Sequence, residues 1–452
     1  MAGMERQTSI TGPSVRGSAT IPRSTWRENL ALTFRYRNET LDLVRGLHDR
    51  HGPVIFQKNA VMPLVSLFGP EANKFVLLDR EQVLSARGAW DLIMGRIFTN
   101  GLLLRDGADH RQHRKIMQGA FSLPALREYV ERMNPHIGGI LAAWRSGETA
   151  RAFRAFKNLT LDLACRIFLG IELGPQAERL NQAFEATVAA SMSIVRLRIP
   201  GLEFDRGVRG REFMIDFFGS MIPGKRAGAE PDLFSRICRA ESEEGDRYSD
   251  QEIVDHLIFL MMAAHDTTTS TLTSLTYELG RRPEWQERAR EECRAFAGDG
   301  LAYDQLGELK VLDMVMYETL RRYPPLSTIP RMSLRPFEYG GYEIPAKVMV
   351  VIYPIHTHHM AEWWTDPLRF DPERFSDERA EQKRHSHSFV PFGGGAHMCL
   401  GYRFAELQIK AVLYQLLRRY RWSLPSGYEM PVQQAPISKP RDGLPIRWEA
   451  LG

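Results

Sequence analysis

One short stretch constrains this chain more than any other. Residues 388–410, SFVPFGGGAHMCLGYRFAELQIK, lead three consecutive glycines towards a single cysteine, Cys399. Leu400, Phe404 and Leu407 then recur at helical spacing, which predicts a helix that begins just after the thiol. The free N–H groups and the dipole of a helix N-terminus favour an anion. We therefore expect this thiol to ionise more easily than a free one.

Glycines on both sides of Cys399 predict an unusual backbone. Residues 393–395 permit angles that are closed to other residues, so a bulky planar group can lie against the chain. Gly401 is expected to do the same beyond the thiol. Taken alone, the cysteine has a second interpretation as a small buried hydrophobic residue in a turn, which is the usual environment of a lone cysteine.

The full pattern favours the first interpretation. Phe392-x-x-Gly395-x-x-x-Cys399-x-Gly401 resembles the haem-binding loop of the cytochrome P450 family, in its soluble bacterial form. The resemblance implies haem b as cofactor, Cys399 as the axial thiolate ligand of its iron, and Phe392 and Gly395 beside it. Thiolate ligation pushes electron density towards the iron and favours cleavage of the O–O bond.

The remaining patterns predict a mainly α fold with a minor β portion. Apolar residues recur at helical spacing in four long segments: Leu123–Trp144, Pro175–Val195, Gln251–Leu279 and Glu284–Phe296. Two segments rich in β-branched and aromatic residues are expected to be strands: Pro63–Leu78 and Phe337–Tyr353. The resemblance implies one large cytochrome P450 fold. We expect a flexible N-terminal segment at 1–27 and a single domain at 28–452, although the size rule favours splitting such a length.

Composition excludes several other classes of protein. A net charge of +4 on 452 residues is too small to indicate nucleic-acid binding. The longest apolar run on a predicted helix, Leu257–Ala264, has eight residues, far below the roughly 20 that span a bilayer. Residues 1–27 contain no apolar core of a signal peptide, so we expect a cytoplasmic protein without a membrane anchor. The four cysteines are widely spaced, which argues against zinc and disulfides.

A charged pair precedes the cysteine loop by about eighty residues. Glu318 and Arg321 stand three apart on a predicted helix, where they can pair, although an isolated pair of this kind is usually a solvated one. Downstream, the segment Asp371 to Phe375 resembles the family segment whose arginine, here Arg374, joins that pair. The resemblance implies one buried network of three charges.

The predicted helix at 251–279 carries the sequence AAHDTT at residues 263–268. It resembles the oxygen-activation motif of the family, with Ala264 where glycine is usual. Two small side chains leave room beside a cofactor, and a threonine hydroxyl that bonds back to the i−4 carbonyl tends to bend or open a helix. The resemblance implies that Thr267 hydrogen-bonds dioxygen and that Asp266 relays protons, while the role of His265 stays open. The alternative is a threonine-rich turn that only fills space.

Four basic side chains match family positions that hold the haem propionates. His110 and Arg114 lie four apart on a predicted helix, Arg331 follows Pro324-Pro325, and His397 stands two residues before the cysteine. An arginine fork suits a carboxylate, which supports this interpretation. Each side chain alone has the alternative interpretation of a solvated surface charge.

Two other motifs are set aside. Gly219 to Lys225 imitates a phosphate-binding loop, but Arg226 stands where Ser or Thr must hold magnesium, and the preceding residues predict a helix. The histidines at 356, 358, 359, 385 and 387 have neither short-spaced cysteine partners nor an H-E-x-x-H motif, so a zinc site is not expected.

The resemblance implies a haem-thiolate monooxygenase that hydroxylates a bulky apolar small molecule of the terpenoid, steroid, retinoid or fatty acyl class. Dioxygen is the co-substrate. Two electrons come from a separate ferredoxin or flavodoxin with its reductase, because the chain has no flavin or iron–sulfur motif of its own. We expect that partner on a basic face with the residues Arg403, Lys410, Arg418 and Arg419. Two alternatives remain: a peroxide-driven peroxygenase, and a haem-based ligand binder or sensor without turnover.

Overall fold

A computed structural model describes residues 20–58, 62–171, 174–191, 193 and 195–451. Most of the N-terminal segment that was expected to be flexible, residues 1–19, lies outside this range. Its last residues are hydrogen-bonded to residue 56. The Ser24 N–H donates to the Phe56 carbonyl at 3.1 Å, and the Phe56 N–H donates to the Pro22 carbonyl at 2.8 Å.

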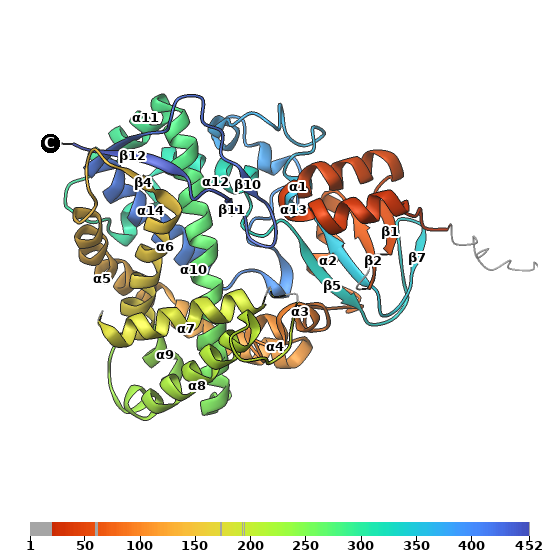
Figure 1. Ribbon diagram of the computed structural model, residues 1–452, viewed down its shortest axis with the longest axis horizontal. Helices are drawn as coiled ribbons and strands as arrows, with labels where there is room; N and C mark the ends of the chain where they lie inside the picture. The colour runs from red at the N-terminus through yellow and green to blue at the C-terminus, as the bar shows by residue number, and fades with distance from the viewer. Residues whose placement is uncertain (1–19, 59–61, 172–173, 192, 194, 452) are drawn as a thin grey trace, which may run out of the picture.

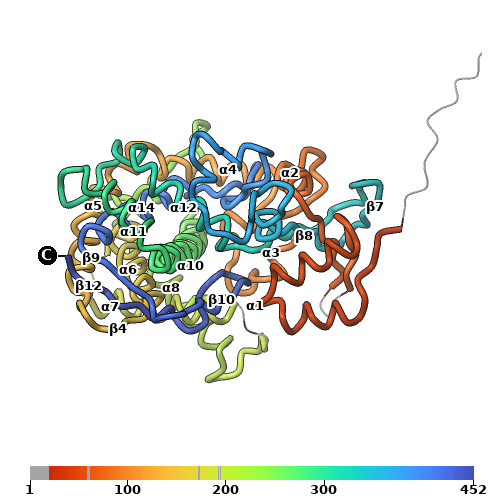
Figure 2. Tube along the Cα trace, turned by 90° about the horizontal axis from the view of Figure 1, so that it is seen from above, coloured from red at the N-terminus to blue at the C-terminus, as the bar shows by residue number. Residues whose placement is uncertain are grey.

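The fold is mainly helical with small sheets, as predicted. The longer helices of the main helical part are α4 (Gly107–Gln118), α5 (Leu123–Ala142), α6 (Ala152–Leu163), α7 (Pro175–Ser191), α8 (Glu203–Ala227), α9 (Leu233–Arg239), α10 (Asp250–Arg281), α11 (Pro283–Arg294), α12 (Lys310–Arg322) and α14 (Tyr402–Arg419). Helix α10 runs through the middle of this part, with α5, α6 and α14 to one side of it and α7 and α8 below (Figure 1). Figure 2 shows α10 almost end-on.

A second part is built around a five-stranded sheet, which lies at the right of Figure 1 with helices against it. Its strands, in spatial order, are β1 (Val54–Lys58), β2 (Pro63–Leu67), β8 (Met349–Ile352), β5 (Ile329–Ser333) and β3 (Leu84–Ser85). Its helices are α1 (Trp26–His51), α2 (Pro70–Leu78), α3 (Ala86–Met94) and α13 (Pro354–Thr357). Strands β2 and β8 pair in parallel although they come from opposite ends of the chain.

Three smaller sheets complete the β portion. They are formed by β6 (Phe337–Tyr339) with β7 (Tyr342–Ile344), by β4 (Thr149–Arg151), β12 (Pro445–Ala450) and β9 (Tyr420–Ser423), and by β10 (Val432–Gln433) with β11 (Lys439–Pro440). The strands β6, β7 and β8 confirm the predicted β character of 337–353.

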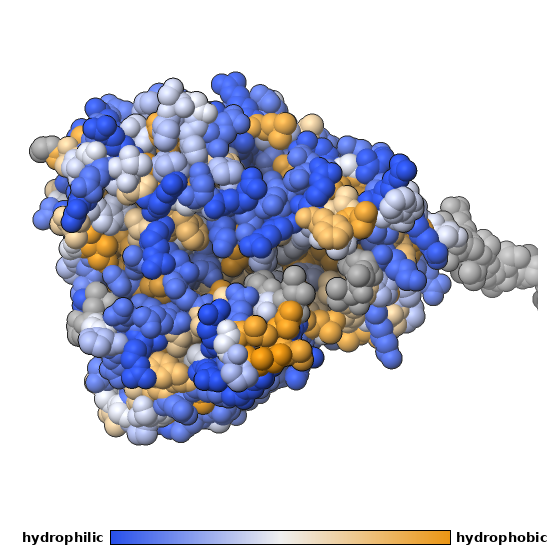
Figure 3. All heavy atoms as spheres, viewed as in Figure 1, coloured by the Kyte–Doolittle hydropathy of each residue, from blue (hydrophilic) through white to orange (hydrophobic). Residues whose placement is uncertain are grey.

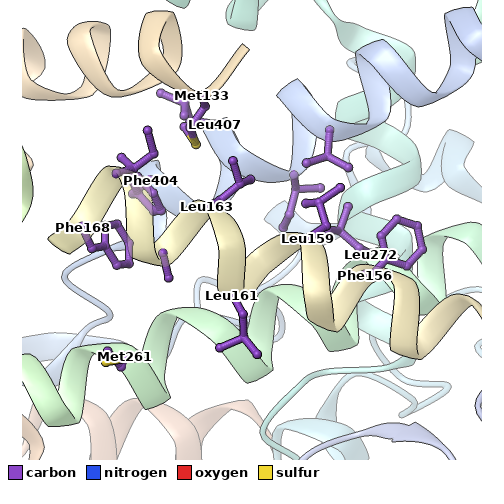
Figure 4. Close-up of a cluster of buried hydrophobic side chains, with 14 of the residues drawn as sticks. Met133, Phe156, Leu159, Leu161, Leu163, Phe168, Met261, Leu272, Phe404 and Leu407 are labelled. Atoms are coloured by element: carbon purple, nitrogen blue, oxygen red, sulfur yellow. The ribbon is translucent and has the colours of Figure 1, made fainter. Parts of the chain in front are cut away.

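The core of the helical part lies where α5, α6, α10 and α14 meet (Figure 4). Phe156 and Leu163 of α6, Met133 of α5, Leu272 of α10 and Leu407 of α14 are all at most 1% exposed. Burial of such side chains is the main favourable term in folding. This packing fixes α10 and α14, the two helices that carry the predicted site, relative to each other.

Half of one predicted strand is a helix. Residues 63–67 form β2 as expected, but Pro70 begins α2, so the prediction for the second half of Pro63–Leu78 is wrong. Gly69, at φ +94°, ends the extended segment, and proline at the first helical position is favourable because its missing N–H has no helical partner there. Ala72 and Val76 then bury the inner face of the helix.

The segment that imitates a phosphate-binding loop, Gly219 to Lys225, lies inside α8, and Lys225 pairs with Asp232 at 2.8 Å. Among the described residues, none of the helices combines the length and the apolar character needed to cross a bilayer.

Candidate active site

The cysteine loop has a backbone that requires glycine at two positions. Gly393 and Gly395 lie at φ +70° and +61°, a region that other residues rarely adopt. A Cβ on Gly395 would also stand 2.0 Å from the Leu77 carbonyl oxygen of α2. The Cys399 N–H donates to the Phe392 carbonyl at 2.9 Å and closes the loop. The glycines therefore let the loop approach α2 closely while the thiol is held at its end.

Gly401 differs from the two loop glycines. Its φ is −89°, and a Cβ there would meet only Phe121 Cε1, at 3.7 Å. The expectation that Gly401 supplies an unusual backbone is wrong. Its contribution is its backbone N–H, which hydrogen-bonds the Cys399 sulfur and lowers the pKa of the thiol.

Cys399 is exposed, in contrast to the other described cysteines, Cys165, Cys238 and Cys293, which are buried. Burial by the surrounding protein nevertheless raises the pKa of its thiol, and this outweighs the lowering by the Gly401 N–H and by Arg114. The prediction that the protein makes this thiol easy to ionise is therefore wrong. A thiol that is accessible and yet desolvated faces an internal space, and a bound metal ion removes its proton outright.

Several side chains in the middle of α10 are also accessible. Helix α10 is buried at residues 253–259 and again at 268–279, but Ala263, Ala264, Asp266 and Thr267 are partly accessible. The Thr267 hydroxyl donates to the Ala263 carbonyl at 2.7 Å, as predicted, while the helix stays continuous through the motif. Small accessible side chains on a central helix leave room for a flat group beside them.

Asp266 is an ionised acid next to Thr267. Burial raises the pKa of its carboxyl, but the overall pKa is lowered because His265, Lys157 and Lys439 favour the charged form. The Asp266 Oδ1 lies 3.0 Å from His265 Nδ1. Lys157 belongs to α6 and Lys439 to β11, so three separate elements set the charge of this carboxylate.

The four predicted propionate-binding residues come together between α4, β5 and the cysteine loop. The His110 and His397 rings lie 4.0 Å apart, centroid to centroid, and the Arg114 Nη1 donates to the Met398 carbonyl at 2.8 Å. Burial, followed by the charge of Arg114, lowers the pKa of His110 to about 4. Burial, followed by the charge of Arg331, lowers the pKa of His397 to about 2.

Arg331 is a buried guanidinium of this cluster and lies near two carboxylates. It is 5% exposed, and its guanidinium donates to the neighbouring Pro330 carbonyl at 2.9 Å. Burial lowers its pKa to about 10, while Asp106 and Asp79 raise it. Both carboxylates already accept backbone N–H groups, from Ala86 and from residues 83–84 respectively. The guanidinium N–H groups of Arg114 and Arg331 suit further carboxylates, such as the two propionates of haem.

Glu318, Arg321 and Arg374 form a fully buried network. Arg321 Nε lies 2.7 Å and Arg374 Nε 3.3 Å from the Glu318 carboxylate, and all three side chains are 0% exposed. Arg321 also donates to the His358 carbonyl at 2.6 Å, and Arg374 donates to the Arg369 carbonyl at 3.1 Å. The network ties α12 to the irregular segment that leads into the cysteine loop.

His358 lies beside this network and makes stability depend on pH. Its Nε2 accepts the Val390 N–H at 3.0 Å, and burial, followed by the charge of Arg321, lowers its pKa from 6.5 to about 3. Below pH 6.5 His358 binds a proton in the unfolded state but stays neutral in the folded state, so stability is lost as the pH falls. We expect a loss of up to about 1.4 kcal/mol per pH unit from this residue between pH 6.5 and 3.

Urea unfolding of the wild type and of His358→Gln at pH 7 and pH 5 measures this loss. Glutamine can still accept the Val390 N–H but does not titrate. We expect the variant to lose less stability than the wild type between the two pH values. Equal losses would show that His358 does not carry the effect.

Several residues around the site were missed by the sequence patterns. Asp106, Lys157 and Lys439 have no motif of their own and reach the site only through tertiary contacts. Asp106 gave one available signal, its position directly before the helix that carries His110.

Together the accessible thiol, the accessible small side chains in the middle of α10 and the cluster of His110, Arg114, Arg331 and His397 fit haem b and define a haem–thiolate protein. A family model described as "Cytochrome P450" matches residues 22–444. "Putative cytochrome P450 136" of Mycobacterium tuberculosis is 39% identical over 411 residues, 90% of this chain and 83% of that protein. "Taxane 10-beta-hydroxylase" of Taxus cuspidata is 27% identical over 444 residues, 92% and 88% of the two chains. The solved structure "Retinoic acid bound cyanobacterial CYP120A1" has a TM-score of 0.85 at 25% identity, and covers 96% of this chain and 100% of that one.

The chain belongs to the cytochrome P450 family. It has the mainly helical cytochrome P450 fold and is a monooxygenase that contains haem b. Such an enzyme acts on apolar substrates with dioxygen and with electrons from a redox partner.

Proposed function

We propose that this enzyme hydroxylates a bulky apolar molecule of the terpenoid or retinoid class, with steroids and fatty acyl compounds as less favoured classes. The observation that carries the proposal is the open middle of α10, where accessible Ala263 and Ala264 adjoin the acid–alcohol pair of Asp266 and Thr267. Haem b, when bound, supplies the redox chemistry that activates dioxygen.

The surface near residues 90–99 and 195–204 supports an apolar substrate. Leu92 of α3 and, after α7, Val195, Leu197 and Ile199 are each 48–59% exposed. Figure 3 shows an apolar patch at the lower centre, in the region where α3 and the chain after α7 lie in Figure 1. Arg196 donates to the Leu92 carbonyl at 3.1 Å, so the two segments are in contact. Exposed apolar patches of this kind often mark the route of an apolar ligand or a partner.

The names of two similar proteins support the same substrate class. One acts on a taxane, which is a diterpenoid, and the other was solved with retinoic acid bound, which has an isoprenoid chain. Both molecules are bulky, largely apolar and built from isoprene units.

Within the site, each of the predicted residues has a proposed role. Cys399 ligates the iron, His110, Arg114, Arg331 and His397 hold the propionates, and Phe392 and Gly395 shape the loop. Thr267 turns its hydroxyl from the Ala263 carbonyl to donate a hydrogen bond to dioxygen, and Asp266 supplies protons. Glu318, Arg321 and Arg374 hold the segment that leads into the loop.

We infer a separate ferredoxin or flavodoxin as electron donor, bound near the cysteine loop. Arg403 is exposed there, and Arg418 and Arg419 are half-buried at the end of α14. Lys410 does not belong to this face: it is 5% exposed, and its Nζ donates to the Leu306 carbonyl at 2.7 Å. A face of arginines steers an acidic partner and is sensitive to salt.

Thr267→Ala is expected to leave haem binding intact and to lower product formed per electron by about tenfold or more. The remaining electrons should appear as hydrogen peroxide, because the alanine cannot donate to dioxygen. Product, electron-donor consumption and peroxide are measured together. Thr276→Ser on the same helix, whose hydroxyl donates to the Leu272 carbonyl at 2.8 Å, is the control and should couple normally. Unchanged coupling in Thr267→Ala would exclude the assigned role.

The substrate class is tested by titrating the oxidised holoprotein with retinoic acid, a diterpene, a steroid and a fatty acid, and recording the spin-state shift. Molecules that bind are then turned over under ¹⁸O₂ with a ferredoxin or a flavodoxin and its reductase. We expect one labelled oxygen in a terpenoid or retinoid product. Product formed only with hydrogen peroxide would identify a peroxygenase, and binding without any product would identify a sensor.

A further inference from the structure

His265 lies between two oxygen acceptors. Its ring is buried in α10, and its Nε2 lies 3.2 Å from the backbone carbonyl oxygen of Lys157 in α6. Its other nitrogen, Nδ1, lies 3.0 Å from Oδ1 of Asp266. The ring of Phe184 in α7 packs against it edge-on, at 5.7 Å between centroids, and holds its orientation.

A count of protons follows from this arrangement. A neutral imidazole has one N–H donor and one lone pair. A carbonyl oxygen can only accept, so Nε2 of His265 carries a hydrogen. A bare Nδ1 would turn its lone pair towards the negative Asp266 oxygen, 3.0 Å away, which is repulsive. A hydrogen on Nδ1 replaces this repulsion by attraction, so the geometry favours a hydrogen on both ring nitrogens.

The charges around Asp266 favour its ionised form. Although burial raises it, the pKa of the Asp266 carboxyl is lowered by His265, Lys157 and Lys439, so the aspartate is ionised. The charge of Lys157 is itself shared with Glu185 of α7, at 3.1 Å, and Lys439 approaches from β11. An ionised Asp266 attracts a hydrogen on the facing Nδ1 of His265. Its Nδ1 is buried and, despite the short distance, forms no well-aligned hydrogen bond, so the contact with Asp266 is mainly an ion pair.

We propose that His265, as an imidazolium, is the positioning residue that orients the Asp266 carboxylate and stores the proton that this carboxylate passes towards Thr267. The proposal rests on the proposed roles of Asp266 and Thr267. In the transfer, Nδ1 of His265 loses its proton to Oδ1 of Asp266, the ring becomes neutral, and Nε2 keeps its hydrogen on the Lys157 carbonyl. The Asp266 side chain is 16% exposed and that of His265 0%, so solvent restores the proton through the carboxylate.

The protonation state is measured by ¹⁵N NMR on the holoprotein with labelled histidine, in the diamagnetic ferrous carbon monoxide form at pH 7. His265→Gln assigns the signals by their disappearance. We expect both His265 nitrogens at the position of protonated nitrogens. In Asp266→Asn, which has no charge to hold the imidazolium, the Nδ1 signal should move to that of a bare ring nitrogen. A bare Nδ1 in the wild type would overturn the proposal.

Coupling measurements provide a second readout. His265→Gln should lower product per electron severalfold, more strongly at pH 8 than at pH 6, with little change in substrate binding. Phe184→Leu, which loosens the same ring without removing its proton, should keep the pH profile of the wild type. Identical profiles for His265→Gln and the wild type would also overturn the proposal. Normal coupling in Thr267→Ala, together with protonated signals from both His265 nitrogens, would contradict the proposed role of Thr267 but not the protonation of His265.

Discussion

Cys399→Ser is expected to abolish the long-wavelength Soret band that the reduced protein shows with carbon monoxide. The loop backbone is fixed by Gly393 and Gly395 and by the Cys399 N–H on Phe392, and a serine can keep all of these features. Only the ligand atom changes, from a polarisable thiolate to a hydroxyl that does not ionise near neutral pH. Substrate oxidation should fall by more than the roughly 100-fold that outer-shell changes cost a metal site.

Cys238→Ser is the matched control, because Cys238 is a buried thiol of the helical part. It should keep the spectrum and the activity, apart from a modest loss of stability. Spectra are recorded on both variants with the haem content determined independently. A thiolate spectrum in Cys399→Ser would mean that another residue ligates the iron.

Glu318→Ala is expected to cost about 3–5 kcal/mol of stability, because it leaves the buried Arg321 without its carboxylate and removes one of the two carboxylates of Arg374, the other being Glu381 at 3.3 Å. Arg321 and Arg374 are both 0% exposed, so water cannot replace Glu318. The Asp371 N–H, which donates to Glu318 at 2.9 Å, loses its acceptor as well. Urea unfolding of the holoprotein measures the loss, and we expect haem release to accompany it.

Asp304→Ala provides the comparison. Asp304 pairs with Arg127 at 2.8 Å, but the two side chains are 77% and 50% exposed, so the expected cost is below about 1 kcal/mol. If Glu318→Ala is too unstable to purify, Glu318→Gln keeps the volume and should still be clearly less stable than the wild type. Equal stability of Glu318→Gln and the wild type would show that the charge of the network does not matter.

Local patterns predicted the parts of the structure that local physics decides. The helices α5, α7, α10 and α11 follow from apolar spacing, whereas α1 and most of α8 were not predicted. The glycines at 393 and 395 follow from backbone angles that only glycine adopts readily. The motif residues were also correctly grouped by resemblance, since Glu318, Arg321 and Arg374 meet in one network.

One local turn and two effects of burial explain what the sequence did not predict. The turn at Gly69-Pro70 converted half of an expected strand into α2, because proline at the first helical position and an apolar helical face outweighed the β-prone composition. Lysine is usually a surface residue, yet Lys410 is buried and its Nζ lies 2.5 Å from the Asp313 carboxylate. The ionisation of Cys399 was mispredicted because burial outweighs the local N–H groups.

The contact between Gly395 and the Leu77 carbonyl has a consequence for biosynthesis. Residue 77 leaves the ribosome long before residue 395, and loop closure over such a separation is slow. The parallel pairing of β2 with β8 requires the same meeting of early and late segments. The thiol therefore reaches its place only when nearly the whole chain has been synthesised, and a chain that ends before residue 399 lacks the thiol.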